Sequence, residues 1–196
     1  MSNGSIMIIG LGDVGGKALE IMARRPGIGR IVAADVNIDY GQKKVNNALY
    51  GAQLEGLFPD IAFRKVDLSN IEQTGELLRD TKPSVIFNST SLQSYWVIEL
   101  LPKEIHRKFQ KAGYGPWVPM HLTLCYNLMQ AVKQSGICTQ VVNGSYPDAV
   151  NPILGKIGLA PAAGIGNLDL IIPQIRNIAA NSIKVHPRHV DPMLVM

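Results

Sequence analysis

The sequence predicts an α/β fold, in which a doubly wound, mainly parallel sheet of about six strands carries helices on both faces. Two observations lead to this prediction. Short, continuous apolar runs recur along the chain, as in strands that are buried on both faces of a parallel sheet. Amphipathic stretches separate these runs, and such alternation is typical of doubly wound sheets with right-handed crossovers. The apolar runs are residues 6–9, 31–34, 61–66, 85–87 and 140–142.

The helices are predicted from aliphatic residues that repeat at intervals of three and four along one face. The first helix runs from Val14 to Met22 and ends in an Arg-Arg-Pro-Gly stretch, which is typical of a helix C-terminus. Residues 91–118 follow no clear period, so we expect a mobile or partner-facing excursion there. The later helices are predicted over residues 39–55, 70–80 and 119–134.

The composition is that of a globular protein with a small charged fraction. Of the 196 residues, 46% are hydrophobic and 17% are charged, against about 25% charged in an average domain. We expect this shortage of charge to reflect a buried interface, in a homo-oligomer or with a missing second domain. The length predicts one main domain, residues 1–182, followed by residues 183–196 as a last strand or as the start of a truncated or missing second domain.

Charge and hydropathy exclude several function classes. The net charge is +4, but the Lys and Arg residues are scattered, so a nucleic-acid partner is not expected. No run reaches the roughly 18 apolar residues of a membrane span, and the N-terminus lacks a secretory-signal pattern. Cys125 and Cys138 lie in apolar patterns, which predicts buried, reduced thiols and a cytoplasmic location. No His, Cys or carboxylate cluster has metal-ligand spacing, so no metal site is predicted.

The most informative stretch is Gly10-Leu-Gly12-Asp13-Val14-Gly15, which joins the first strand to the first helix. In such a turn the first glycine allows a tight bend, and the second lets a pyrophosphate approach the backbone. The third lets the helix pack closely on the strand. The amides at the helix start, around Asp13 and Val14, attract phosphates together with the helix dipole. The stretch therefore predicts a dinucleotide-binding turn.

An acid at the end of the second strand predicts which dinucleotide binds. Asp35 closes the run Arg-Ile-Val-Ala-Ala-Asp, twenty residues after Gly15. A carboxylate at this place accepts hydrogen bonds from both hydroxyls of an adenosine ribose and repels a 2′-phosphate. We therefore expect NAD as the cofactor, with NADP less favoured. S-adenosylmethionine is a third possibility, because it can use a similar glycine turn and ribose acid.

Further candidates follow the third, fourth and fifth strands, at the sheet edge where ligands of such folds bind. Asp67 and Leu68 follow the third strand and are placed either to bracket an adenine or to lead into a helix N-cap at Ser69 or Asn70. Small polar residues suit the wall beside the second phosphate and ribose, and amides suit the nicotinamide end. The candidates are Asn88, Ser89 and Thr90 for that wall, and Asn143 and Asn151 for the nicotinamide end.

These motifs resemble the NAD-binding Rossmann half of dehydrogenases of the lactate and malate dehydrogenase type. The likeness rests on the glycine turn, on Asp35, on Asn151-Pro152 and on residues 164–169, Gly-Ile-Gly-Asn-Leu-Asp. In that family a strand leads into an Asn-Pro pair whose Asn helps to orient substrate and nicotinamide, so the resemblance implies this role for Asn151. Residues 66–91 are similar instead to saccharopine reductases and extended short-chain oxidoreductases.

The chain departs from the lactate and malate dehydrogenase pattern where a substrate would be recognised. The family has an arginine three residues after the Asp of the last motif, and this chain has Ile172. The arginine before the helix at 119 is also missing, so a bidentate grip on a substrate carboxylate is not expected. The catalytic residues are left unknown. His186 is a candidate proton shuttle if it ends a last strand, with a surface role favoured, and for His121 a neutral role or a surface position is favoured over catalysis.

The sequence thus predicts an NAD(P)-dependent oxidoreductase, or its isolated coenzyme-binding domain, which transfers hydride to or from a small substrate. The protein would orient the dinucleotide, and the nicotinamide would supply the hydride. The alternative is a non-catalytic module for dinucleotide sensing or for interaction, which would bind NAD(H) without turning over a substrate. The identity of the substrate is left open.

Overall fold

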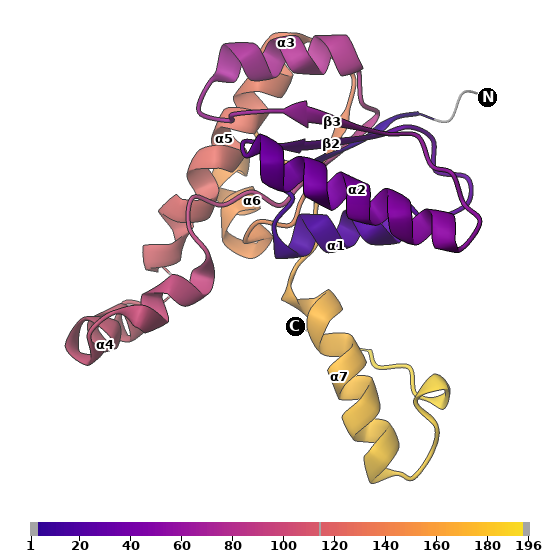
Figure 1. The fold of residues 1–196 in the computed structure, drawn as a ribbon. Coiled ribbons are helices and arrows are strands. Elements are labelled where there is room, and N and C mark those ends of the chain that lie inside the picture. Colours follow the sequence, from indigo (N-terminus) through magenta and orange to yellow (C-terminus); the bar gives the residue numbers. More distant parts are fainter. Residues whose placement is uncertain (1–3, 114, 194–196) are drawn as a thin grey trace. The chain divides into compact units, whose positions relative to one another are not determined.

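Six parallel strands form one sheet in the computed structural model, which describes residues 4–113 and 115–193 (Figure 1). Their order across the sheet is β3-β2-β1-β4-β5-β6, so the chain winds outward from β1 and then from β4. This is the predicted doubly wound α/β fold of the Rossmann type, and the prediction is confirmed. The strands are β1 (Ile6–Ile9), β2 (Ile31–Asp35), β3 (Ile61–Lys65), β4 (Val85–Asn88), β5 (Gln140–Asn143) and β6 (Ala163–Gly164).

The pairing register brings the carboxyl ends of the central strands level with one another. Ile9, the last residue of β1, pairs with Ala34 on one side and with Asn88 on the other. Asn88 in turn pairs with Asn143 of β5. The residues that follow these strands therefore share one edge of the sheet, where the order reverses between β1 and β4 and where such folds bind ligands.

Each face of the sheet carries an apolar core. In β1, the side chains of Met7 and Ile9 enter one cluster and that of Ile8 enters the other, because successive side chains of a strand point to opposite faces. Burial of each large aliphatic side chain contributes about 1.5–3 kcal/mol. Helices α1 (Asp13–Met22) and α2 (Ile38–Leu54) cover the Ile8 face, and α3 (Ile71–Thr81) and α5 (Val118–Ser135) cover the other (Figure 1).

Helix α6 (Pro147–Gly155) packs on α5 through a third apolar cluster that includes Cys125 and Leu154. The thiol of Cys125 is buried, as predicted, but Cys138 is exposed. The prediction for Cys138 is wrong because this residue lies in the short loop between α5 and β5, where the apolar pattern of the sequence does not face the core. None of the described helices has both the length and the apolar composition of a membrane span.

An excursion separates β4 from α5, as the sequence predicts. It contains η1 (Tyr95–Leu100), α4 (Lys103–Lys111) and η2 (Gly115–Trp117), and Figure 1 shows α4 extending away from the helices that cover the sheet. Helix α4 buries none of its residues, so little apolar packing holds it. Its Phe109 ring meets that of Trp117 edge-on, with centroids 6.2 Å apart, and this contact links α4 to the start of α5.

The described residues divide into two compact units, one that ends at Gly164 and one that begins at Ile165, whereas the sequence predicts a boundary after residue 182. The described part of the second unit holds α7 (Asn167–Ser182) and η3 (Pro187–His189). Arg176 of α7 forms an ion pair with Asp191, with a nitrogen-to-oxygen distance of 3.4 Å. The unit is thus a helix with a short returning segment.

Residues 183–193 do not form the predicted last strand. Their backbone bonds close locally, from His189 N–H to His186 O and from Val190 N–H to Pro187 O. Pro187 has no N–H to offer to a neighbouring strand. His186 caps η3 by accepting a bond from Arg188 N–H, and it does not end a strand at the sheet. The sixth strand is instead the two-residue β6, which pairs with β5.

Candidate functional site

A cavity of about 660 Å³ lies along the carboxyl edge of the sheet. Residues that follow β1, β2, β3 and β4 form its wall, which extends to Trp96 of η1 and to Leu124 of α5. The volume falls within the range of small-molecule sites, about 300–1,000 Å³. No Lys, Arg or His side chain lines the cavity in the part of the chain that the structure describes.

The glycine turn forms one wall of this cavity, and its glycines have different surroundings. Gly10 has a φ of +86°, a left-handed conformation that other residues rarely adopt. At Gly15, a Cβ atom would overlap the carbonyl oxygen of Gly10 and the hydroxyl of Ser89, so α1 packs closely only without one. At Gly12, a Cβ atom would meet nothing within 4 Å. Gly12 lines the cavity, and its bare backbone leaves space for a ligand.

Helix α1 begins at this turn without a side-chain cap. Gly12 is its N-cap residue and supplies no side-chain bond. The bond from Gly16 N–H to Gly12 O, at 2.8 Å, is the first of the helical series, so the amides of Asp13, Val14 and Gly15 come before the bonded part. These amides and the helix dipole attract an anion. The Asp13 carboxylate opposes that attraction, but it is exposed and screened by solvent.

Asp35 joins the end of β2 to the glycine turn. Its Oδ2 accepts a hydrogen bond from Leu11 N–H at 2.7 Å, and its Oδ1 accepts one from Asn37 N–H at 2.9 Å. The carboxylate lines the cavity together with Gly10 and Gly12. Each carboxylate oxygen can accept a further bond, so ribose hydroxyls can bind Asp35 without displacing the backbone amides.

The cavity is apolar beside Asp35. Val36 and Tyr40, around the start of α2, and Val66 and Leu68, after β3, line this part. Val36 is 58% exposed and Tyr40 is 40% exposed, so covering them with a flat ring would remove apolar surface from water. Leu68 offers less surface than its predicted role as an adenine bracket needs, because it packs in the core and is 4% exposed.

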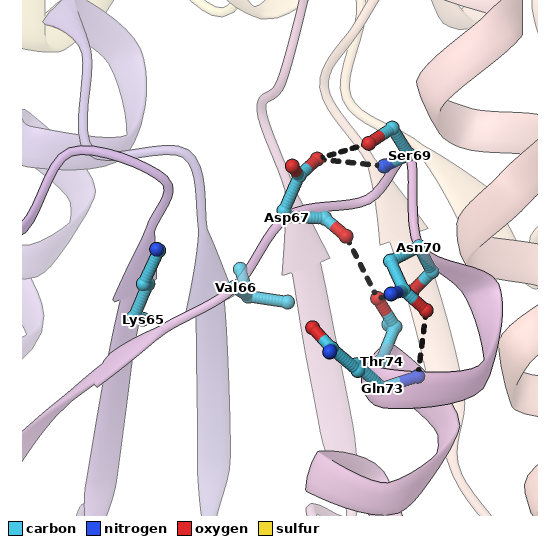
Figure 2. Close-up of a pocket in the computed structure, with 7 residues that line it drawn as sticks. All are labelled: Lys65, Val66, Asp67, Ser69, Asn70, Gln73 and Thr74. Atoms are coloured by element: carbon cyan, nitrogen blue, oxygen red, sulfur yellow. Dashed lines mark hydrogen bonds between the residues drawn. The ribbon is translucent and has the colours of Figure 1, made fainter.

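Asp67 lines both this cavity and a smaller hollow of about 270 Å³ (Figure 2). Its Oδ1 accepts bonds from Ser69 Oγ–H at 2.7 Å and from Ser69 N–H at 2.9 Å, and these bonds hold the pKa of Asp67 below its ordinary value. Asn70 caps α3 by accepting a bond from Gln73 N–H at 3.0 Å. The predicted N-cap is therefore Asn70, and Asp67 both leads into that cap and faces the cavity.

After β4, Ser89 and Thr90 line the cavity, whereas Asn88 does not. Ser89 Oγ–H donates to Gly10 O at 2.8 Å and ties this strand end to the glycine turn. Asn88 is fully buried. Its Nδ2 donates to Asn143 Oδ1 at 3.0 Å, and its Oδ1 accepts a bond from Thr90 Oγ1–H at 2.8 Å. Asn88 therefore positions Thr90 from inside the fold.

Asn143 is also buried, and its neighbours satisfy its side chain. Its Nδ2 donates to Asn151 Oδ1 at 2.9 Å and to Ser145 O at 3.1 Å. Its Oδ1 accepts bonds from Asn88 Nδ2 and from Ser145 N–H. Neither Asn143 nor Asn151 lines the cavity. Three predicted site residues thus form one internal amide network.

The Asn-Pro pair that carries part of the resemblance lies inside a helix. Asn151-Pro152 falls in the second turn of α6, not between a strand and a helix. The position between β5 and α6 is held by Tyr146-Pro147, with Pro147 at the first helical position, where its missing N–H is tolerated. Tyr146 therefore stands where the resemblance implied an asparagine. In the Gly-Ile-Gly-Asn-Leu-Asp motif, the side chains of residues 167–170 lie outside the described residues.

Behind the end of β4 lies a set of polar contacts that the sequence did not indicate. Ser145 Oγ–H donates to Thr90 O, and Ser145 Oγ lies 2.9 Å from His121 Nδ1. His121 is half-buried near the start of α5, and burial lowers its pKa below the ordinary value of 6.5. The neutral His121 of the prediction is thus favoured, but its partner comes from a loop distant in sequence. One feature of the sequence could have indicated this contact. Thr90, His121 and Ser145 all flank the crossover from β4 through α5 to β5.

The predicted site residues divide into those on the cavity and those beneath it. Val14 is exposed at the start of α1, and Gly15 is buried under the turn. The excursion also contributes residues to the cavity. The sequence did not predict them, because the lack of a clear period in that stretch indicated only a mobile or partner-facing segment. The predicted residues on the cavity are Gly10, Gly12, Asp13, Asp35, Asp67, Leu68, Ser89 and Thr90, and the added ones include Val36, Tyr40, Leu92, Ser94, Trp96 and Leu124.

Comparison with known proteins finds likeness in structure alone. No family model and no curated protein sequence matches the chain. Lactate dehydrogenase from Eimeria maxima, solved with NADH and oxamate, matches with a TM-score of 0.66 and 15% identity over 96% of this chain and 51% of that chain. Malate dehydrogenase from Picrophilus torridus, in its apo form, gives a TM-score of 0.69 and 19% identity over 97% and 54%. Lactate dehydrogenase from Cryptosporidium parvum, complexed with lactic acid and nicotinamide adenine dinucleotide, gives 0.64 and 18% over 97% and 53%.

At these identities the likeness shows the fold. It confirms the predicted resemblance to lactate and malate dehydrogenases at the level of the sheet and its crossovers. The chain spans about half the length of these dehydrogenases. The similarity of residues 66–91 to saccharopine reductases stays a prediction.

Proposed function

We propose that this chain is the coenzyme-binding domain of an NAD-dependent oxidoreductase, which transfers hydride to or from a small substrate. One observation carries the proposal: the uncapped start of α1 and the Asp35 carboxylate lie on one cavity, and the 2.7 Å bond from Leu11 N–H to Asp35 joins them. The amides suit a diphosphate and the carboxylate suits a ribose. The hydrogen bond from Leu11 N–H thus fixes the distance between the start of α1 and the Asp35 carboxylate.

The rest of the cavity suits the remaining parts of NAD(H). The exposed faces of Val36 and Tyr40 offer an apolar seat for adenine beside Asp35. Ser89 and Thr90 offer hydroxyls on the other side of the glycine turn. When bound, the nicotinamide supplies the hydride chemistry, while the residues of this chain bind and orient it. Two of the matching lactate dehydrogenases were solved with NADH or with nicotinamide adenine dinucleotide, which supports the same class of ligand.

A second candidate function is a dinucleotide-binding module without catalysis. The observation that favours it is the lack of Lys, Arg and His among the described residues that line the cavity. A substrate carboxylate would find no cationic partner there, and a guanidinium is the group that binds carboxylates best. This module would bind NAD(H), but no small substrate would be turned over.

Calorimetric titration with NADH, NADPH and S-adenosylmethionine tests the proposed ligand. We expect NADH to bind about tenfold or more tightly than NADPH, a difference of about 1.4 kcal/mol, because Asp35 repels the 2′-phosphate. A preference for NADPH would contradict the role of Asp35. Binding of S-adenosylmethionine alone would replace the proposed function with that of another adenosine-ligand protein.

The charge and the hydrogen-bonding capacity of Asp35 can be separated with a matched pair of variants. Asp35→Ala removes the acceptor for Leu11 N–H and Asn37 N–H, so it should weaken NADH binding and lower the free energy of unfolding by about 1–3 kcal/mol. Asp35→Asn keeps one carbonyl acceptor and loses the charge, so it should reduce the preference over NADPH with a smaller loss of stability. Titrations and thermal melts measure both effects. An unchanged NADH dissociation constant in both variants would remove Asp35 from the site.

The whole protein's partners and location follow as part of the same proposal. We expect a small-molecule substrate, together with a second copy or a second domain that completes its site, since the chain spans about half the length of the matching dehydrogenases. A cytoplasmic location is supported by the thiols of Cys125 and Cys138, both of which are free. Mass measurement in solution, with and without NADH, tests the homo-oligomer.

A further inference from the structure

We infer that His121 exchanges the substrate proton beside the cavity wall formed by residues 90–92 and that Ser145 is the residue that orients it. This inference rests on the proposed function, because it needs a dinucleotide in the cavity. Three elements meet at this place. Thr90 follows β4, His121 lies near the start of α5, and Ser145 follows β5.

A single hydroxyl proton decides the direction of these hydrogen bonds. Thr90 O is a carbonyl oxygen and can only accept, so Ser145 donates its one proton to Thr90. Ser145 Oγ can then only accept from His121 Nδ1, which lies 2.9 Å away. The proton of the neutral imidazole is therefore on Nδ1, and Nε2 carries a lone pair that can accept a proton.

His121 lies beside the wall of the cavity and does not itself line it. His121 is half-buried, so part of its side chain reaches solvent. Thr90, which anchors the hydrogen bonds, lines the cavity itself. Leu92, another lining residue, donates its N–H to the O of Met120 at 2.9 Å, directly beside His121. The base thus adjoins the wall formed by residues 90–92.

The surroundings of His121 favour its neutral form. The Tyr146 ring lies 5.6 Å away between centroids, and the buried Cys125 lies one turn further along α5. Burial raises the pKa of the Cys125 thiol to about 12. Phenol and thiol groups ordinarily carry no charge near pH 7, so neither stabilises an imidazolium. Burial itself lowers the pKa of His121.

The backbone of Tyr146 gives an independent sign that this corner is functional. Tyr146 has a φ of +49°, in the left-handed region that is unfavourable for a non-glycine residue. Such strain persists where the surrounding structure requires a specific geometry, often at active sites. Here the strained residue follows Ser145 directly and places its ring beside His121.

The proton and the hydride of the substrate have different acceptors. In oxidation of an alcohol, the O–H proton of the substrate would pass to His121 Nε2, and its carbon would give up a hydride to a bound NAD⁺. The carbon–oxygen bond becomes a carbonyl, the substrate loses two electrons, and His121 becomes an imidazolium. Ser145 Oγ keeps accepting the hydrogen bond from Nδ1–H throughout, so the ring does not rotate. In reduction, the Nε2 proton returns to the carbonyl oxygen.

Nitrogen NMR of the intact chain, with ¹⁵N-labelled histidine rings, tests the inference without a substrate. Above neutral pH, we expect His121 to show a protonated Nδ1 and a bare Nε2. Ser145→Ala should lose this single tautomer, and the conservative Ser145→Thr should keep it. With NAD⁺ bound, His121 should titrate at a lower pH than with NADH bound, because the oxidised ring is positively charged. The resonances of His106, on α4, serve as the internal control. They should not differ between wild type and Ser145→Ala, or between the NADH and NAD⁺ complexes.

The outcomes separate the two proposals. If calorimetry detects no NADH binding, the proposed function and this inference are both wrong. If NADH binds, but His121 carries its proton on Nε2 or titrates identically with NADH and NAD⁺, only this inference is wrong. A Ser145→Ala protein that binds NADH and keeps the Nδ1–H tautomer would show that Ser145 does not orient the ring.

Discussion

The two sides of the sheet edge use their polar side chains in opposite ways. On the β2 side, Asp35 accepts two backbone amides and still presents its oxygens to the cavity. On the β5 side, Asn88, Asn143 and Asn151 bond to one another and leave the cavity wall to other residues. A buried amide must find partners inside the fold, because each unpaired group costs about 1–3 kcal/mol. Burial therefore decides which strand-end residues are available to a ligand.

The largest expected effect separates folding from binding within the glycine turn. Gly15→Ala should lower the free energy of unfolding by about 3 kcal/mol, because its Cβ would overlap Gly10 O and Ser89 Oγ. Gly12→Ala is the matched control for folding, since its Cβ meets open space. It should keep the wild-type melting curve and weaken NADH binding about tenfold or more. Wild-type affinity in Gly12→Ala would mean that no diphosphate approaches this backbone.

A smaller loss of stability is expected on the amide side. Asn143→Ala leaves the amide of Asn88, the carbonyl of Asn151 and the N–H of Ser145 without their partner. Urea denaturation should show a free energy of unfolding that is lower by about 2–4 kcal/mol. Asp67→Ala, whose side chain is exposed, should change it by about 1 kcal/mol or less. Comparable losses in the two variants would contradict the distinction between the sides.

The pH dependence of stability sharpens the comparison at His121. Because burial lowers its pKa in the folded state, the unfolded chain binds the proton more readily below about pH 6.5. This group therefore costs no stability above that pH, and stability is lost as the pH falls from 6.5 toward the folded pKa. As the pH falls from 7.5 to 5.5, the free energy of unfolding of the wild type should decrease more than that of His121→Gln. A constant difference would contradict the burial of the ring.

The smallest effect is chemical and leaves the fold intact. Burial raises the pKa of Cys125 to about 12, whereas Cys138 is exposed. A thiol reagent at pH 7.5 should therefore label Cys138 in the native protein and reach Cys125 only after denaturation. Mass spectrometry of labelled peptides measures this. Rapid labelling of Cys125 in the native state would show that the core beneath the amide network is open.

Sequence patterns predicted strands β1 to β5 within a residue or two, because buried strands of a parallel sheet appear in the sequence as continuous apolar runs, but they did not predict β6. They also predicted the glycine turn and Asp35, whose placement depends on local geometry around one strand, one turn and one helix. The prediction for Asn151 placed the start of the helix at Pro152, whereas α6 begins at Pro147. Either proline fits a motif in which a strand is followed by a proline and then by a helix. Of the two alternatives predicted for residues 183–196, the last strand does not form in residues 183–193, because the local bonds of η3 cannot be predicted from an apolar pattern.

The sequence by itself determined strands β1 to β5, their crossovers and the side of the cavity that holds the glycine turn and Asp35, since each depends on residues within one strand-turn-helix unit. Only the tertiary structure decided the other side. Asn88, Asn143 and Asn151 could have faced a ligand or one another, and His121 needed a partner 24 residues away at Ser145. Hydrogen bonds between separate crossovers depend on how the helices pack, and a linear pattern does not contain those distances.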